Sequence, residues 1–491
     1  MPSLPPAHRV DTFGGPLHVK WEADSEVTAH GSITYFIEFL NVSGLWEEWV
    51  RDCPLAYTSP NAPRKEEILG TILLSVLAGH KRYSHITSMR QDPVLPQLLG
   101  LACLRSEDSI RRAFAHVDGD AATLWLDLHL NRTYEPLLGT AWILDLDATV
   151  KPLYGEREEA RLGYNPHKPG RPSHVYQACL CSAAKLVLNV DVQAGNQTAS
   201  EYAQPVLWGW PSLLRGDLAH GSENMMKEAE ARNLPYLFKL KRSPGVLKLI
   251  AELGVRDVGW QDAGGHWRGI ESSIRLQGWS RLRRVIVPRR KVGTPPERFE
   301  DLEPGNEQMA LPGLEWQDRQ GERYEHAVLV TSWAEQSVLA VAQMYRDRAD
   351  AENMFDELKN QWGWTGYTTR DHKRSQLMAR IVALVFNWWS IFTRMATRNM
   401  HREALTTRPL FLFSLARKTR SGNQSFLTIQ SMHAKAGKVA HLLARISGWF
   451  KRFKIMEEQL ALSQRWCVML RWIFPYITAE KRSGKLLEGT A

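Results

Sequence analysis

The chain has 491 residues, of which 44% are hydrophobic and 23% are charged, and it carries 62 Lys and Arg against 53 Asp and Glu. This balance excludes an intrinsically disordered chain, which would have fewer apolar residues and a larger net charge for its length. The length excludes a small domain stabilised by disulfides and predicts about three domains.

Residues 1–138 are predicted to form a mainly helical region that binds DNA. Apolar residues recur here at helical spacing, and Lys65–Ala78 is expected to be an apolar helix. Ser106 is a suitable N-cap for a helix that carries Arg111 and Arg112 on its outer side. Paired arginines on a short helix can enter a DNA groove, and a solvated helix face explains them at least as well.

Residues 139–241 are predicted to be the first part of an α/β core. Trp142–Val150 alternates around two acids and predicts a buried strand, which a polar link rich in glycine and proline follows. The subsequent order of strands and helices favours a mixed sheet with helices packed on it. The further strands are expected at Val175–Ser182, Lys185–Gln193, Leu213–Gly216 and Tyr236–Leu240, and the helices at Ala199–Leu207 and Glu223–Arg232.

Residues 242–326 are rich in Gly, Trp and alternating Val, Ile and Arg, which predicts a β-rich insertion of short antiparallel strands and long loops. Residues 327–396 return to the core as its second part. It is expected to hold a strand at Val328–Trp333 and helices at Gln343–Trp362 and Ser375–Ala396.

Residues 397–491 are predicted to be helical and basic. From residue 371 to the last residue there are 21 Lys and Arg against 6 Asp and Glu, whereas the other 370 residues have 41 against 47. A basic tail on a slightly acidic body indicates a polyanionic partner, with nucleic acid ahead of a membrane surface. A solvated helical surface is the alternative.

The five cysteines include no CxxC pair, so they provide no zinc framework and fit a reducing compartment. The first ten residues lack the apolar core of a signal peptide, and the most apolar runs are too short to span a bilayer. We therefore expect a cytoplasmic protein with no membrane partner.

Four residues near position 350 are predicted to share one helix face. Their spacing places them within roughly 60° of each other around a helix, and apolar neighbours suggest that this face lies at a cleft edge. A surface helix with an Arg–Glu pair four residues apart is the ordinary alternative. The four residues are Tyr345, Arg348, Glu352 and Lys359.

Asp147 and Asp217 stand at the ends of two predicted strands, and Glu352 lies on a packed helix. Three carboxylates so placed suit two Mg²⁺ ions, which prefer oxygen ligands. Such a pair, about 3.5–4 Å apart, stabilises the attacking and leaving oxygens of a phosphodiester. Each acid alone is a weak signal, and it is the ordered set that points to metal-dependent phosphoryl transfer.

The pattern Tyr-x2-Arg-x3-Glu-x6-Lys, within YRDRADAENMFDELKNQWGW, resembles the signature of bacterial insertion-sequence DDE transposases of the Tyr-Arg-Glu-Lys class. LDLDATV, followed by LYG and GYNPHKPGRPSH, resembles the first-aspartate region of one branch of these transposases. RGD at residues 215–217 resembles their second-aspartate region. The resemblance covers roughly residues 140–395 well and the N-terminal helices loosely. It implies an RNase H-like mixed-sheet catalytic core, interrupted by the β-rich insertion and flanked by helical N-terminal and C-terminal regions. Asp147, Asp217 and Glu352 take the three acid positions.

By the same resemblance, the chain would be an endonuclease and strand-transfer enzyme that performs cut-and-paste DNA transposition. Two Mg²⁺ ions, replaceable by Mn²⁺, would be held by the three acids. The partners would be double-stranded DNA, as terminal inverted repeats and target, and a second copy in a homodimer that bridges two DNA ends. Such a bacterial protein would be nucleoid-associated when bound to DNA.

Two points stay open. Asp145 competes with Asp147 for the first position, and Asp147 is preferred because Ala-Thr follows it. After Asp217 the chain has Leu-Ala-His-Gly, where this branch usually has Ser-Gly-Phe. The alternatives are an RNase H-like nuclease or resolvase, and a catalytically inactive transposase-derived protein that binds DNA.

Three groups of side chains are predicted to contact DNA. The first, by resemblance, contacts phosphates near the cleavage point and consists of Tyr345, Arg348 and Lys359. The second is expected in a loop one strand from Asp147, where a phosphate contact and a solvated loop are equally open, and consists of Lys168, Arg171 and His174. The third is a candidate for backbone contact and consists of Lys239, Lys241 and Arg242.

Overall fold

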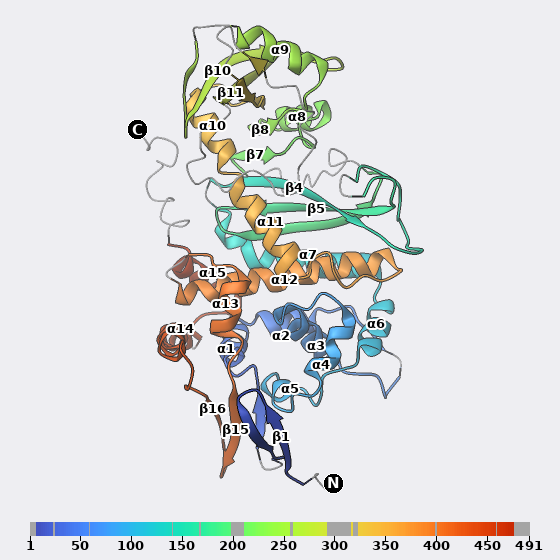
Figure 1. The fold of residues 1–491 in the computed structure, drawn as a ribbon, viewed down its shortest axis with the longest axis vertical. Coiled ribbons are helices and arrows are strands. Elements are labelled where there is room, and N and C mark those ends of the chain that lie inside the picture. Colours follow the sequence, from blue (N-terminus) through green and yellow to red (C-terminus); the bar gives the residue numbers. More distant parts are fainter. Residues whose placement is uncertain are drawn as a thin grey trace.

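The computed structural model describes residues 6–22, 25–57, 59–139, 141–165, 168–197, 211–255, 259–291, 316–317, 323–397, 400–457 and 459–475. The molecule is layered along its long axis (Figure 1). A β-rich part lies at one end, a broad sheet lies in the middle, and helices from both ends of the chain lie below it. None of the helices described is both long enough and apolar enough to cross a membrane.

The central strands lie in the order β6-β5-β4-β7-β8. β4 pairs antiparallel with β5 and β5 with β6, whereas β4–β7 and β7–β8 are parallel. The predicted strands are confirmed, and the helix expected at Ala199–Leu207 lies outside the described residues. The bounds are β4 (Ile143–Pro152), β5 (Ser173–Cys181), β6 (Leu186–Ala194), β7 (Leu213–Gly216) and β8 (Tyr236–Lys239), with helix α8 (Glu223–Ala231) between the last two.

The strands of the predicted insertion extend this same sheet. β14 pairs antiparallel with β8, and β11 pairs with β14, so that the whole sheet has eleven strands among the described residues. The antiparallel pattern expected here is confirmed. The bounds are β9 (Gln261–Gly264), β10 (Trp267–Ile274), β11 (Arg283–Lys291), β12 (Trp316–Gln317), β13 (Arg323–His326) and β14 (Leu329–Thr331).

Helix α9 (Pro244–Gly254) begins this part and was not predicted. Its signals are in the sequence, because Ser243 caps the helix by accepting a hydrogen bond from the Val246 amide, and Pro244 occupies the first turn. Buried apolar residues then recur at helical spacing up to Leu253. This helix was not predicted because the rest of the segment has the alternation that is typical of β-strands.

The single helix predicted at Gln343–Trp362 is wrong, since two helices stand there, α10 (Val338–Arg346) and α11 (Ala349–Gln361). At the break, the Arg348 amide donates to the Tyr345 carbonyl at 3.1 Å, a bond over three residues that tightens the turn. The next helix, α12 (His372–Ala396), is confirmed, and Asp371 caps it through the Arg374 amide at 3.1 Å.

Helix α12 is the axis of the helical layer, and every residue from Leu377 to Ala396 is buried. It packs against β6 and helix α7 (Gly119–Tyr134) on the sheet side, and against α1, α3, α14 and α15 from the two chain ends. One continuous hydrophobic cluster therefore joins both ends of the chain to the sheet. The helices are α1 (Ile33–Ser43), α2 (Leu45–Arg51), α3 (Lys65–Leu77), α4 (Ile86–Met89), α5 (Leu95–Leu98), α6 (Glu107–Ala115), α13 (Ala404–Phe411), α14 (Ala436–Glu457) and α15 (Leu462–Ile473).

The N-terminal helices are as predicted, with Ser106 capping α6 through the Ser109 amide. The prediction that the C-terminal region is helical throughout is wrong, because it contains a β-hairpin that also pairs with a short N-terminal strand. The hairpin is mostly exposed, so its sequence lacks the apolar alternation that marks a buried strand. The terminal strands are β1 (His8–Thr12), β2 (Gly15–Val19), β3 (Glu26–Thr28), β15 (Ala416–Ser421) and β16 (Gln424–Ile429).

Candidate active site

The sheet register brings two of the predicted acids together. In the parallel pair β4–β7, Leu146 stands opposite Gly216, so Asp147 and Asp217 occupy the next step along the two chains. Adjacent strands lie about 4.8 Å apart, so the two residues are neighbours at the middle of the sheet. The electrostatic influence of Asp217 on Asp147 agrees with this proximity.

A second, smaller hydrophobic cluster positions the helices over the same face of the sheet. Val338, Val341 and Ala342 of α10 pack there against strand residues that include Leu213, with Tyr345 partly buried beside them. Helix α11 then contacts β4 and crosses the sheet (Figure 1). Because α10 is fixed in this way, the turn that follows it points residue 348 toward the acids.

Arg348 connects the first and third predicted acids. Its guanidinium lies 3.3 Å from Asp147 Oδ2 and forms an ion pair with Glu352 one helical turn further on. The side chain is only 5% exposed. Burial acts to lower the pKa of Arg348, but the carboxylates of Asp147, Asp217 and Glu352 raise it above its ordinary value. One buried positive charge therefore attracts all three acids and pairs directly with two of them.

The two neighbouring aspartates are affected in opposite directions. Burial raises the pKa of Asp147. Burial is the largest single influence on Asp217 and acts in the same direction, but the hydrogen bond with His220 and the nearby positive charges of His220 and Arg348 together outweigh it. They hold the pKa of Asp217 well below its usual range. His220 Nδ1 lies 2.7 Å from Asp217 Oδ1, and the Ala219 amide donates to the same oxygen at 2.9 Å. The residues that follow Asp217 therefore hold it as a carboxylate, and sequence reasoning had assigned His220 no role.

Asp145 faces a different partner from Asp147. Its Oδ1 lies 2.5 Å from Arg215 Nε and its Oδ2 lies 2.9 Å from Arg215 Nη2, while Ser182 also donates to it. Arg215 donates further to the Met344 carbonyl at 2.5 Å. This fully buried pair thus joins β4 and β7 to the last turn of α10. Sequence reasoning missed Arg215 because its partner depends on the strand register.

The other residues predicted on the shared helix face lie around this centre. Glu352 keeps 36% of its side chain exposed, so it is the most accessible of the acids that Arg348 contacts. Lys359 is partly buried two turns further along α11 from Glu352, with its Nζ 5.8 Å from the centre of the Phe355 ring. Tyr345 lies in the last turn of α10 and stays near Arg348 despite the break.

Two of the predicted basic loop residues gather around one tyrosine. Lys168 Nζ lies 5.1 Å and Arg171 Cζ lies 4.5 Å from the centre of the Tyr154 ring, and all three side chains are exposed. The prediction that His174 belongs to this loop is wrong, because it pairs with Lys151 inside the β4–β5 ladder. It is buried, and its Nε2 lies 2.8 Å from the Glu158 carbonyl, which leaves it no access to a phosphate.

The third predicted group follows the end of β8. Lys239 is the last residue of that strand, and Lys241 and Arg242 are exposed in the link to α9. Arg242 Nη2 lies 3.4 Å from the His326 carbonyl, so this side chain also contacts β13. Leu240 is buried between the lysines, as alternation along an extended chain requires.

The chemistry of the donor set suits a hard divalent cation, because the three acids offer carboxylate oxygens and two of them, Glu352 and Asp217, are partly exposed. In the part of the chain that the structure describes, no group of three or more Asp, Glu, His or Cys side chains is already arranged to hold a metal ion. Arg348 instead stands among the acids. A cation would therefore have to share the carboxylates with this arginine or displace it.

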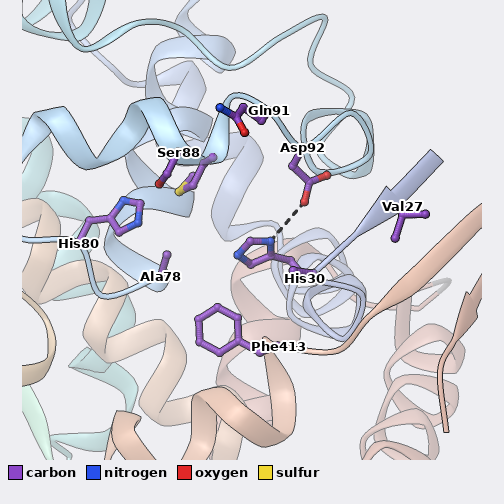
Figure 2. Close-up of a pocket in the computed structure, with 10 residues that line it drawn as sticks. Val27, His30, Ala78, His80, Ser88, Gln91, Asp92 and Phe413 are labelled. Carbon is purple, nitrogen blue, oxygen red and sulfur yellow. Dashed lines mark hydrogen bonds and ion pairs between the residues drawn. The ribbon is translucent and has the colours of Figure 1, made fainter. Parts of the chain in front are cut away.

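A cavity of about 350 Å³ lies far from these acids, between the N-terminal helices and the start of β15 (Figure 2). Val27, His30, Asp92 and Phe413 are among its lining residues. His30 Nδ1 lies 3.3 Å from Asp92 Oδ2. No residue of the acidic centre lines it, so the cavity is a separate feature of the helical end.

Three comparisons relate the chain to known proteins. A family model described as "Transposase DDE domain" matches residues 138–388, a range that contains Asp147, Asp217 and Glu352. A search of curated proteins gave no match. Among solved structures, the chain is similar to piggyBac transposase in a synaptic complex with hairpin DNA, studied by cryo-EM. That similarity has 11% sequence identity and a TM-score of 0.38, and it covers 96% of this chain and 90% of that chain.

Proposed function

The chain belongs to the transposase DDE domain family, and from this premise we propose that it performs cut-and-paste transposition of a bacterial insertion sequence, as a member of the Tyr-Arg-Glu-Lys class. The observation that carries the proposal is the convergence of Asp147, Asp217 and Glu352 on the Arg348 guanidinium. These residues come from two strands and a helix, in the order that the resemblance requires.

We assign Asp147, Asp217 and Glu352 as the three catalytic acids. Asp147 is favoured over Asp145 because both oxygens of Asp145 are already bonded to Arg215. Asp145 then acts as a positioning residue that fixes β4 against β7 and α10.

An RNase H-like core is the fold we propose for residues 139–241 and 327–396. Its support is the antiparallel meander β4-β5-β6 followed by the parallel strands β7 and β8. Residues 242–326 interrupt this core between β8 and β14, and residues 1–138 and 397–491 flank it. Strand β11 continues the core sheet through β14, which would couple the insertion rigidly to the catalytic centre.

Two Mg²⁺ ions, or Mn²⁺ in their place, would be held by the three acids. When bound, they supply the charge that activates the attacking oxygen and stabilises the leaving one. His220 keeps Asp217 oriented and ionised through the bond to its Oδ1. With the acids holding cations, Arg348 would be released from part of its contact with them and could bind a phosphate.

The reaction would consist of in-line phosphoryl transfers with no covalent enzyme intermediate. Water attacks a strand at the element end, and the freed 3′-hydroxyl then attacks a phosphodiester of the other strand or of the target. Tyr345, Arg348 and Lys359 would position the phosphates near the cleavage point. Backbone contacts further away are assigned to Lys168, Arg171, Lys239, Lys241 and Arg242, and a homodimer would hold the two DNA ends together.

The test uses a DNA fragment bearing the element's terminal repeats, incubated with the full chain and Mg²⁺. We expect end cleavage and strand joining, both lowered about a thousandfold or more by Glu352→Gln, since several kcal/mol of transition-state stabilisation are lost. Asp356→Asn is the matched control, because Asp356 is an exposed acid one turn along the same helix. It should change the rates less than twofold.

Three other outcomes would contradict the assignment of the acids or support a different function. Cleavage that survives Glu352→Gln would contradict the assignment of the acids. Cleavage without strand joining would favour an RNase H-like nuclease or resolvase. Binding of the ends without cleavage by the unmutated chain would favour an inactive transposase-derived DNA-binding protein.

A further inference from the structure

The segment between Glu403 and Glu457 contains no acidic residue. Over these 53 residues it carries ten basic side chains, and all except Arg408 are at least partly exposed. They are Arg408, Arg417, Lys418, Arg420, Lys435, Lys438, Arg445, Lys451, Arg452 and Lys454. The segment spans β15, β16 and α14, so this end of the molecule presents a positive surface without an acid of its own.

The β15–β16 hairpin projects from this surface as a ribbon (Figure 1). Its six residue pairs run from Ala416 opposite Ile429 to Ser421 opposite Gln424, which makes each strand about 20 Å long. Gly422 and Asn423 form the two-residue turn, where Gly422 adopts a φ of 57° that glycine tolerates best. Strand β3 joins only at the root, so the outer half of the ribbon is two strands wide.

The two faces of the ribbon have different surroundings. Paired residues share a face, and on one face Lys418 is held against the body, with its Nζ 3.6 Å from Glu26 and also bonded to Gln97. On the opposite face Arg417 and Thr419 are exposed. Within the described residues Arg417 makes no ion pair, so one of two adjacent cations is bound by the protein and the other is available to a partner.

We propose that the face carrying Arg417 and Thr419 docks in a groove of duplex DNA. This inference rests on the proposed function, since it takes DNA as the partner of the chain. The major groove admits a two-stranded ribbon. On this face Arg417 stands at the root beside β3. The outer half of the same face presents Thr419, Ser421 and Gln424, with the exposed Phe426 opposite Thr419. Arg, Thr, Ser and Gln side chains donate hydrogen bonds to phosphates and base edges. No acid of the ribbon opposes a polyanion.

The root of the ribbon leads into the cavity of Figure 2. Val27, which stands opposite Arg417 on the same face, is one of the residues that line it, and so is Phe413 just before β15. The acid among the lining residues, Asp92, is engaged by His30 and by the Thr28 hydroxyl at 2.6 Å. The docking face therefore continues into the cavity beside β15, and the acid there is already bonded, so it would not repel DNA.

Arg417→Ala and Lys418→Ala form a matched pair, since they remove one charge each from adjacent residues on opposite faces. We expect Arg417→Ala to weaken binding of a labelled 30-base-pair duplex about fivefold and to reduce the salt slope of binding by about one. Lys418→Ala should weaken binding less than twofold. Fluorescence anisotropy across a salt series measures both effects, and thermal unfolding verifies that the variants fold alike.

The outcomes separate this inference from the proposed function. Equal losses in the two variants, or no loss in Arg417→Ala, would overturn the docking face while leaving cleavage by the unmutated chain intact. Duplex binding that depends on Arg417 in a chain that never cleaves would support the ribbon and count against the transposase activity. A failure of the unmutated chain to bind any duplex would overturn both.

Discussion

The acidic centre and the β15–β16 ribbon balance their charges in different ways. At the centre, Arg215 and Arg348 are buried and paired with carboxylates of the same chain. On the ribbon, Arg417 is exposed and has no such pair among the described residues. Breaking a buried pair leaves a charge without solvent, whereas removing an exposed cation mainly lowers attraction to a partner. Substitutions should therefore damage structure or chemistry at the centre and affinity at the ribbon.

The largest effect should come from Arg215→Met, which leaves Asp145 buried without its partner. We expect the free energy of unfolding to fall by about 3–5 kcal/mol, as measured by urea unfolding. Arg417→Ala is the comparison, and it should change that free energy by less than about 0.5 kcal/mol. Similar losses in both variants would remove the distinction between the two regions.

A smaller effect on chemistry is expected at His220. Removal of its bond to Asp217 in His220→Ala should lower the rate of end cleavage about 10–100-fold, as is typical for residues that orient a metal ligand. His220→Asn can place an amide near the position of Nδ1 and should recover most of the rate. DNA affinity should stay unchanged in both, and a parallel loss of affinity would instead indicate a general structural role.

Glu357 is a second buried acid with partners in the same chain, and it should make the free energy of unfolding depend on pH. It is buried, accepts bonds from Trp362 Nε1 at 3.0 Å and the Ala404 amide at 2.9 Å, and pairs with His401 at 2.7 Å. Burial acts to raise its pKa, but these partners hold the pKa below its ordinary value. The resulting stability is present above the ordinary pKa of a glutamate, about 4.3, and is lost as the pH falls through the lower folded value.

Glu357→Gln should therefore cost about 1–3 kcal/mol of unfolding free energy at pH 7 and less in acid. Unfolding measured in urea between pH 7 and pH 3 tests this. Glu228→Gln serves as the control, since Glu228 is half exposed and, within the described residues, forms an ion pair only with Arg232 at the end of the same helix. A cost that is equal at both ends of the pH range would contradict the ionised role of Glu357.

The smallest effect is expected at the paired arginines of α6. Arg111 lies 4.0 Å from Glu107 and 5.3 Å from the Tyr83 ring centre, and Arg112 Nε donates to the Asp108 carbonyl at 3.3 Å. These contacts favour a solvated helix face over a groove-reading helix. Replacing both arginines with Ala should weaken duplex binding less than twofold, in contrast to Arg417→Ala. A larger loss would instead support the interpretation that α6 enters a DNA groove.

Local patterns predicted much of the core because the strands there are buried. Leu213–Gly216 was predicted at its observed bounds, and the acid that follows it was found by its position at a strand end. The break before α11 was not predicted, since Asp347 and Arg348 suit a helix and only their surroundings bend the chain. The pairing of Arg215 with Asp145 likewise required the register of two strands. The ribbon was missed because its exposed strands lack the apolar alternation of a buried strand, and its third strand, β3, lies at the other end of the sequence.

The pairing of β3 with β15 also affects the order in which the regions of the protein can fold during synthesis. Strand β3 leaves the ribosome early, but it gains its neighbour only after most of the chain has been synthesised. The same holds for α1, which packs against α14 and α15. Contacts between such distant segments slow folding and keep apolar surfaces exposed in the meantime. The N-terminal region is thus completed last although it is translated first, and a prematurely terminated chain would lack the support for it.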